Sequence, residues 1–304
     1  MEVETRFESF DERFDALIRP EARLERLCTG FIWAEGPVYF AEGDYLLWSD
    51  IPNNRMMRWH DQEGMSTFRQ PSNFTNGHYR DLEGRLISCE HGGRRVSRTE
   101  KDGSISILID NYRGKKLNSP NDVVVKSDGT IWFTDPPYGI LSNHEGYQAD
   151  SELGHCYVFR FDPLSNDLSI VATDRDKPNG LAFNLDETIL YVSDTGKSHN
   201  PDGWHHIFAY DVIGGKTLSP GRIFAEINPG LSDGFRIDKH GYIFTSSQDS
   251  IQVYSPEAEL LGKIMVPEPI ANCSFGGQKK DRLFITASTS LYSIYLNTQG
   301  VQRP

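Results

Sequence analysis

Six residues with oxygen-bearing side chains recur along the chain at intervals of about 40 to 60 residues, and together they could do chemistry. Each one opens an apolar stretch, and each is followed about 15 residues later by the end of a second apolar stretch. Two of the side chains are carboxylates and four are amides, so a site built from them would be rich in oxygen ligands. The six are Glu35, Asn76, Asn121, Asn179, Asp233 and Asn272.

If these side chains converge, the site they form favours a hard divalent cation. Ca²⁺ comes first on this criterion, and Mg²⁺ or Mn²⁺ also fit it. Glu35 and Asp233 are the strongest indication of such a cation site, because two unpaired carboxylates in a narrow space repel each other unless a cation or a proton lies between them. Asn76 and Asn272 have an equally good second interpretation, in which they cap strand ends or bind channel water.

The elements that must position these residues form a repeat. A repeat of about 40 to 45 residues with four strands each is typical of a β-propeller. The third unit shows the pattern most clearly, with strands expected over Asp122–Lys126, Ile131–Thr134, Cys156–Phe161 and Leu168–Ala172. The sequence therefore predicts an all-β fold, a six-bladed β-propeller of four-stranded blades.

The two ends of the chain complete this prediction. The last unit has three obvious strands, the final one over Leu291–Leu296, and an N-terminal strand over Ala22–Cys28 supplies the fourth. Closing the ring in this way removes both exposed edges. Residues 1–20 are expected to be an N-terminal arm with a short helix between Phe7 and Ile18, and residues 21–304 a single propeller domain.

Propeller topology predicts which residues share a face. The start of the first strand, the end of the second and the start of the third lie on one side of each blade. The six openers therefore meet at one mouth of the axis, and long links at 136–155 and 195–206 should form its rim. Acidic residues and a histidine are expected just behind the openers; they are Asp50, Glu90, His91, Asp135 and Asp194.

Several of these side chains have competing interpretations. Asp135 and Asp194 could cap loops, and the segment from Asp135 to Tyr138 could instead belong to a second, structural cation site. A Zn²⁺ site of rim histidines is conceivable, although solvated histidines are more common; the residues are His155, His205 and His206. Aromatic residues at alternate strand positions are expected to pack between blades; they are Trp33, Phe40, Trp48, Trp132 and Phe133.

Composition excludes other classes of protein. The net charge of -12 argues against a nucleic-acid partner, because phosphate binding needs a basic surface. The chain has no run of 18 apolar residues that would predict a membrane span, and its acidic N-terminus lacks the apolar core of a signal peptide, so we expect a cytoplasmic protein. We also expect a monomer or a homodimer. The four cysteines lie far apart and are expected to be buried, reduced thiols rather than disulfides.

Beyond these physical arguments, several short motifs follow one another along the chain; they are Glu35-Gly36-Pro37, Ser119-Pro120-Asn121-Asp122-Val123, Trp132 to Gly139, Pro178-Asn179-Gly180-Leu181 and Asp233-Gly234. In type and order they resemble those of the SMP-30/gluconolactonase/luciferin-regenerating-enzyme family, over roughly residues 22 to 296. Cys89-Glu90-His91-Gly92 is similar to a segment common in its bacterial gluconolactonase branch.

The resemblance implies a six-bladed propeller with one catalytic divalent cation, often Ca²⁺, that hydrolyses sugar lactones. Carried over by motif, Glu35, Asn179 and Asp233 are the metal ligands, and Asn121 is a fourth ligand or a substrate contact. Mammalian members have an arginine that contacts sugar hydroxyls two residues before the asparagine of the third motif. Ser119 takes that place here, so other groups must recognise the substrate hydroxyls.

Further substrate contacts are expected from Asn76, His91 and Tyr138, although His91 could instead hydrogen-bond the backbone of a neighbouring blade. In the implied mechanism the cation polarises the lactone carbonyl, and a carboxylate moves a proton from water to the leaving ring oxygen. Asp233 is the first candidate for this proton shuttle and Asp122 the second. A carboxylate bound to a dication is a poor base, and the alternation of a strand would turn Asp122 away from the axis, so both candidates stay open.

Two other functions use the same fold. An organophosphate-triester hydrolase could use the same cation, and a non-catalytic propeller could bind a protein or sugar around a structural metal. A condensing enzyme of the strictosidine-synthase type is disfavoured, because that relative lacks this set of acidic axial residues.

Overall fold

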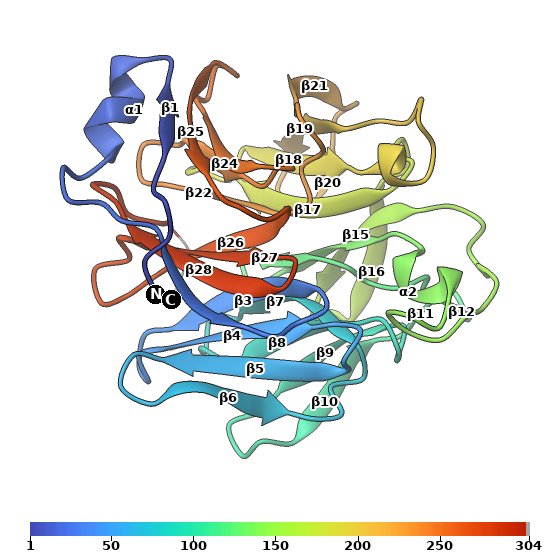
Figure 1. The fold of residues 1–304 in the computed structure, drawn as a ribbon. Helices are drawn as coiled ribbons and strands as arrows, with labels where there is room; N and C mark the ends of the chain where they lie inside the picture. The colour runs from blue at the N-terminus through green and yellow to red at the C-terminus, as the bar shows by residue number, and fades with distance from the viewer. Residues whose placement is uncertain (302–304) are drawn as a thin grey trace.

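The computed structural model describes residues 1–301, which form six small antiparallel sheets around one axis (Figure 1). The first strand of each sheet contacts the first strands of the neighbouring sheets, so these inner strands form a closed ring. The predicted six-bladed β-propeller is therefore confirmed.

Blades one to three run outwards from the axis in sequence order. Blade one contains β3 (Ala34–Phe40), β4 (Tyr45–Asp50), β5 (Arg55–His60) and β6 (Gly64–Arg69). Blade two contains β7 (Thr75–Arg80), β8 (Leu86–Glu90), β9 (Arg95–Thr99) and β10 (Ile105–Ile109). A hairpin of β11 (Asn111–Tyr112) and β12 (Lys115–Lys116) leads to blade three, which contains β13 (Val123–Val125), β14 (Ile131–Asp135), β15 (Tyr157–Asp162) and β16 (Asp167–Ala172), with α2 (Tyr138–Leu141) after β14.

Blades four and five each carry an additional strand. Blade four contains β17 (Pro178–Phe183), β18 (Ile189–Asp194) and β19 (His206–Ile213), and both β20 (Thr217–Leu218) and β21 (Arg222–Glu226) pair with β19; a 3₁₀ turn, η1 (Gly196–Ser198), follows β18. Blade five contains β22 (Phe235–Ile237), β23 (Ile243–Thr245), β24 (Ser250–Tyr254), β25 (Leu260–Met265) and, at its outer edge, β1 (Phe7–Ser9). The expectation of four strands in every blade is therefore wrong for these two.

Blade six closes the ring as predicted. It contains β26 (Ile270–Gly276), β27 (Arg282–Ala287), β28 (Ser290–Tyr295) and the N-terminal strand β2 (Glu25–Thr29), which pairs antiparallel with β28. The inner and second strands are buried on both faces, whereas an outer strand such as β6 is mostly exposed. The core therefore lies near the axis and between the blades.

The N-terminal arm differs from its predicted form. The helix, α1 (Glu12–Leu17), is shorter than the Phe7–Ile18 pattern suggested, because Phe7 lies in β1 and pairs with Ile264 of β25 (Figure 1). Asp11 begins the helix by accepting a hydrogen bond from the Arg13 backbone N–H. The open edge of β25 thus captures residues whose spacing alone indicated a helix.

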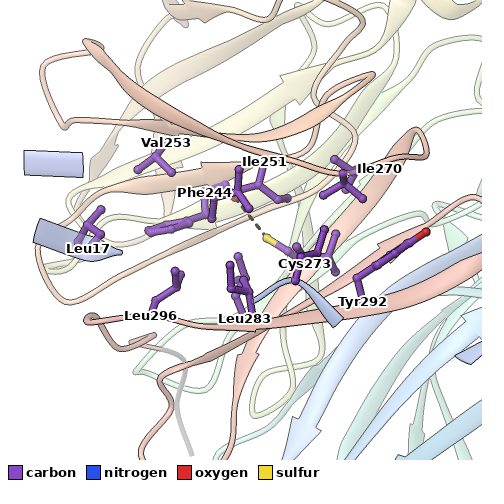
Figure 2. Packing of buried hydrophobic residues seen from close by; sticks show 14 of the residues in the cluster. Leu17, Phe244, Ile251, Val253, Ile270, Cys273, Leu283, Tyr292 and Leu296 are labelled. Atoms are coloured by element: carbon purple, nitrogen blue, oxygen red, sulfur yellow. Dashed lines mark hydrogen bonds between the residues drawn. The ribbon is translucent and has the colours of Figure 1, made fainter. Parts of the chain in front are cut away.

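Apolar side chains between blades five and six show how neighbouring blades adhere (Figure 2). Phe244 and Val253 of blade five face Leu283 of blade six, and Leu17 of α1 closes the outer end of the cluster. The Cys273 thiol donates to the Phe244 carbonyl across the interface, at 3.4 Å. Each fully buried side chain of this size contributes about 1.5–3 kcal/mol, so the blades are joined mainly by hydrophobic burial.

The remaining cysteines and aromatics mostly follow expectation. All four cysteines are free thiols; Cys89 and Cys273 are buried, whereas Cys28 and Cys156 are only half-buried. Trp48 and Trp132 are fully buried between blades.

None of the helices in the described part of the chain has the length and hydrophobicity needed to span a bilayer.

Candidate functional site

A cavity of about 320 Å³ lies at the mouth of the axis where the inner strands begin. Five of the six predicted openers line it; they are Glu35, Asn76, Asn121, Asn179 and Asp233. The sixth, Asn272, donates from Nδ2 to Glu35 Oε2 at 3.1 Å and so holds that carboxylate in place. The structure thus brings together side chains from all six blades.

Glycines that follow the openers allow the inner strands to come this close. The Gly77 backbone N–H donates to the Asn121 carbonyl, and the Gly180 N–H donates to the Asp233 carbonyl, both at 2.8 Å. A Cβ atom on Gly77 would lie 2.5 Å from the Asn121 carbonyl oxygen, and one on Gly180 would lie 2.4 Å from that of Asp233. Any larger residue would push the next opener away from the axis.

Hydroxyl groups from the second strands also hold the opener backbones, and the sequence analysis missed them. Ser49 Oγ donates to the Asn76 carbonyl at 2.8 Å, and Thr134 Oγ1 donates to the Asn179 carbonyl at 2.7 Å. Their signal was a serine or threonine directly before the acid that ends the second strand, as in Ser49-Asp50. Blades one and three therefore each help to position the opener of the following blade.

The acids at the ends of the second strands are buried and bind backbone N–H groups. Asp50 accepts from the Ile32 N–H at 3.0 Å, and Asp194 accepts from the Lys177 N–H at 3.0 Å. Asp135 accepts from the Asn118 N–H at 2.8 Å, and its burial raises its pKa to about 7. These contacts match the loop-capping interpretation, while a second cation site near Asp135 stays a prediction.

The carboxylates at the cavity are crowded. Burial, followed by the charges of Asp233 and Asp122, raises the pKa of Glu35 well above its usual value. Burial, followed by the charges of Glu145 and Asp122, raises the pKa of Asp233 to about 8. The hydrogen bond from Asn272 offsets only part of the effect on Glu35. These carboxylates cannot all ionise together unless a cation or a proton lies between them.

The donor set also constrains any cation site. Among residues 1–301, no group of three or more His, Cys, Asp and Glu side chains could hold a metal ion. A cation at the axis would therefore need amide oxygens in addition to Glu35 and Asp233. Asn121 and Asn179 line the same cavity and can supply them, and this all-oxygen set fits a hard cation.

The crowding predicts that the cation-free protein loses stability as pH rises. Asp233 has its unfolded pKa near 3.8 and its folded pKa near 8, so the folded state binds the proton more tightly across this window. We expect the free energy of unfolding in EDTA to fall by a few kcal/mol between pH 4 and pH 8. Urea unfolding of wild type and of Asp233→Asn at several pH values would check this, because the free energy of unfolding of the variant should depend clearly less on pH. An equal dependence on pH in both proteins would show that Asp233 is not crowded.

Asp122, the second candidate proton shuttle, does not line the cavity. Its Oδ2 lies 3.7 Å from Arg236 Nη1, and both side chains are only 2% exposed. Burial raises the pKa of Asp122, and the Arg236 charge partly opposes this. Because Arg236 belongs to blade five, which does not neighbour blade three, this contact spans the central channel, and the expectation that alternation turns Asp122 away from the axis is wrong. The catalytic role of Asp122 stays a prediction.

His91 lies behind Asn76 and is completely buried. Its Nδ1 contacts the Glu145 carbonyl oxygen at 3.1 Å, and its Nε2 contacts Asn76 Nδ2 at 3.3 Å. Because a carbonyl only accepts, Nδ1 carries the proton and Nε2 accepts from the Asn76 amide. Burial lowers the pKa of His91 to about 4, so the ring is neutral. His91 therefore orients Asn76 and anchors the long loop of blade three.

The two long loops reach the cavity, as their lengths predicted. Tyr138 lines it and hydrogen-bonds Thr195, whose Oγ1 also accepts from Asn179 Nδ2 at 3.3 Å. Cavity residues that the sequence analysis missed are Ile51, Glu145, Thr195, Ser198, His199, Leu231, Gln248, Pro269 and Ile270. Trp33 also lines the cavity, which corrects its assignment to inter-blade packing. The lengths of the two loops and their polar composition signalled Glu145, Thr195, Ser198 and His199, whereas the other residues lie outside these loops.

The rim histidines do not gather into a metal site. His205 Nδ1 donates to the Ile227 carbonyl at 2.9 Å, and its Nε2 lies 3.2 Å from Glu226. His206 is adjacent, whereas His155 belongs to the other long loop and packs against Tyr157. None of these three lines the cavity.

Comparison with known proteins agrees with this architecture. The chain is 33% identical to a gluconolactonase from Zymomonas mobilis, covering 96% of this chain and 86% of that one. It matches the structure of a gluconolactonase from Xanthomonas campestris with a TM-score of 0.91 and 37% identity, covering 97% and 96% of the two chains. Regucalcin from Agrobacterium tumefaciens, a calcium-binding protein, has a TM-score of 0.75 over 92% and 95% of the chains, and its 15% identity shows the fold alone. Residues 33–289 match the model of the SMP-30/gluconolactonase/LRE-like region, and the chain belongs to that family.

Proposed function

We propose that the protein hydrolyses a sugar lactone, such as glucono-1,5-lactone, in the axial cavity. The observation that carries the proposal is the meeting of Glu35 and Asp233 with three asparagine amides in one cavity of about 320 Å³. A cavity of this size suits a small, cyclic substrate. The gluconolactonases among the relatives support the same reaction.

Four residues would hold a divalent cation, Ca²⁺ before Mg²⁺ or Mn²⁺; they are Glu35, Asn121, Asn179 and Asp233. When bound, such an ion supplies an electrophile for the ester carbonyl oxygen and offsets the negative charge that develops there. The crowding of the two carboxylates supports this assignment.

The chain's own groups handle the proton. Asp233 stands at the cavity wall, where its carboxylate can accept a proton from water. Water adds to the carbonyl carbon, the bond from that carbon to the ring oxygen breaks, and Asp233 returns the proton to the ring oxygen. Asn76 and Tyr138 line the same space and would hold the substrate hydroxyls.

Metal removal tests the proposal. We expect the purified protein to hydrolyse glucono-1,5-lactone well above its spontaneous rate, to lose this activity in EDTA and to regain it with excess Ca²⁺. A pH-indicator assay of acid release measures the rate, with heat-denatured protein as the control. Full activity after exhaustive metal removal would overturn the metal-assisted reaction. Absence of any lactone turnover in the metal-loaded protein would leave a binding protein or a phosphotriester hydrolase.

A further inference from the structure

The cavity has one apolar wall. Its residues lie at or beside the starts of inner strands and the ends of second strands in blades one, five and six, and they are Trp33, Ile51, Leu231, Pro269 and Ile270. Ser247 and Gln248 of blade five border this wall. Trp33 and Ile51 are tied together by the hydrogen bond from the Ile51 N–H to the Trp33 carbonyl at 3.2 Å. None of these five side chains offers a charged group to a ligand.

A polar wall, formed by the loops of blades three and four, lies across the axis from the apolar one. Its residues are Tyr138, Glu145, Thr195, Ser198 and His199. Tyr138 Oη lies 2.6 Å from Thr195 Oγ1 and 3.0 Å from Ser198 Oγ, and Ser198 Oγ lies 2.8 Å from His199 Nδ1. This network presents several groups that both donate and accept hydrogen bonds.

The cavity also has a one-sided charge. Its lining residues within the described chain include three carboxylates, Glu35, Glu145 and Asp233, but no lysine or arginine. An anionic substituent on the substrate would therefore meet these carboxylates and no cationic side chain, and the proposed divalent cation is already held by Glu35 and Asp233.

These walls must receive a ring whose two edges differ. In a 1,5-lactone with its carbonyl facing Glu35 and Asp233, the C2 and C3 hydroxyls lie on one side of the carbonyl, and the ring oxygen with the C5 substituent lies on the other. Hydroxyls buried against the apolar wall would lose their hydrogen bonds, whereas the polar wall can replace them. The hydroxylated edge therefore belongs on the polar wall and the C5 substituent on the apolar wall.

We propose, resting on the lactonase function above, that the site selects neutral aldono-1,5-lactones whose C5 substituent is small and uncharged, and excludes those phosphorylated or sulfonated at C6. The apolar wall around Trp33 and Ile270 contacts the C5 substituent, and the polar wall around Tyr138 and Ser198 hydrogen-bonds the C2 and C3 hydroxyls.

A series of lactones tests this selectivity through kcat/KM, corrected for spontaneous hydrolysis. Relative to glucono-1,5-lactone, we expect the 6-deoxy compound and xylono-1,5-lactone, which lacks C6, to stay within about threefold or to improve. The 2-deoxy compound should lose about tenfold or more, and the 6-phospho compound about a hundredfold or more. A 6-phospho lactone turned over as well as glucono-1,5-lactone would overturn the proposal.

A matched pair of arginine variants tests the orientation. Gln248 and Ser198 are both exposed cavity residues, but Gln248 follows β23 of blade five beside the apolar wall, and Ser198 belongs to the polar wall. We expect Gln248→Arg to raise the ratio of kcat/KM for the 6-phospho lactone to that for glucono-1,5-lactone by tenfold or more, and Ser198→Arg to leave this ratio low. If only Ser198→Arg raised this ratio, or if neither variant raised it, the assignment of the walls would be wrong.

The proposed function and this inference fail in different ways. If wild type hydrolyses none of the neutral lactones, the lactonase function is wrong. If it hydrolyses them without discrimination at C2 or C6, the function stands and the selectivity is wrong.

Discussion

Glu35→Gln and Asp233→Asn are each expected to lower kcat/KM for lactone hydrolysis by about 10³-fold or more. Both replacements keep the shape of the side chain and remove one negative charge from the cavity. Loss of one preorganised electrostatic group in an active site typically costs about 10²–10³-fold, and here the same change would also weaken a bound cation. Steady-state kinetics with saturating Ca²⁺ measures the effect.

The control for these variants is Glu63→Gln. Glu63 is also a carboxylate, but it forms an ion pair with Arg58 on the exposed outside of blade one. We expect unchanged kinetics for the control, and an unchanged far-ultraviolet circular dichroism spectrum for all three proteins. If Glu35→Gln or Asp233→Asn kept more than a tenth of the activity, the axial site would not be the reaction centre.

Arg236→Met is expected to destabilise the fold by about 3–5 kcal/mol. Arg236 and Asp122 form an ion pair between β22 and the start of β13, and each side chain is only 2% exposed. Removal of the guanidinium leaves a buried carboxylate without its cation, which costs more than the pair itself contributes. Urea unfolding at neutral pH, followed by tryptophan fluorescence, gives the change in free energy.

The double variant Asp122→Asn/Arg236→Met separates the charge from the packing. Neither residue is then charged, so we expect the double variant to recover at least half of the stability that Arg236→Met loses. A double variant as unstable as the single one would mean that the loss comes from packing around Arg236. A single variant that loses less than 1 kcal/mol would show that the pair has no structural role.

Arg236 is a residue whose strand position can be predicted from the sequence but whose partner cannot. Its place on an inner strand follows from the pattern of Asp233-Gly234 and the apolar residues after it. Its partner does not, because Asp122 stands on another blade, and alternation along a strand predicts the face of a side chain but not its neighbour across the ring.

The same limit explains two features that differ from prediction. The spacing of Phe7, Phe10 and Phe14 fits a helix, yet Phe7 pairs with Ile264 in β1, because an unpaired edge of blade five is available to it. Trp33 has the type and position of a packing residue, yet it lines the cavity together with Leu231 of blade five and Ile270 of blade six.

By itself, the sequence determined the period of the repeat, and with it the six blades, the closing N-terminal strand and the residues that open each inner strand. These features depend on local alternation and on turn residues, which act over a few positions along the chain. Only the tertiary structure decided that Glu145 joins the cavity, that His91 holds its loop and that one wall is apolar and the other polar. Those contacts join residues far apart in the sequence, and they form only when closure of the ring brings the blades together.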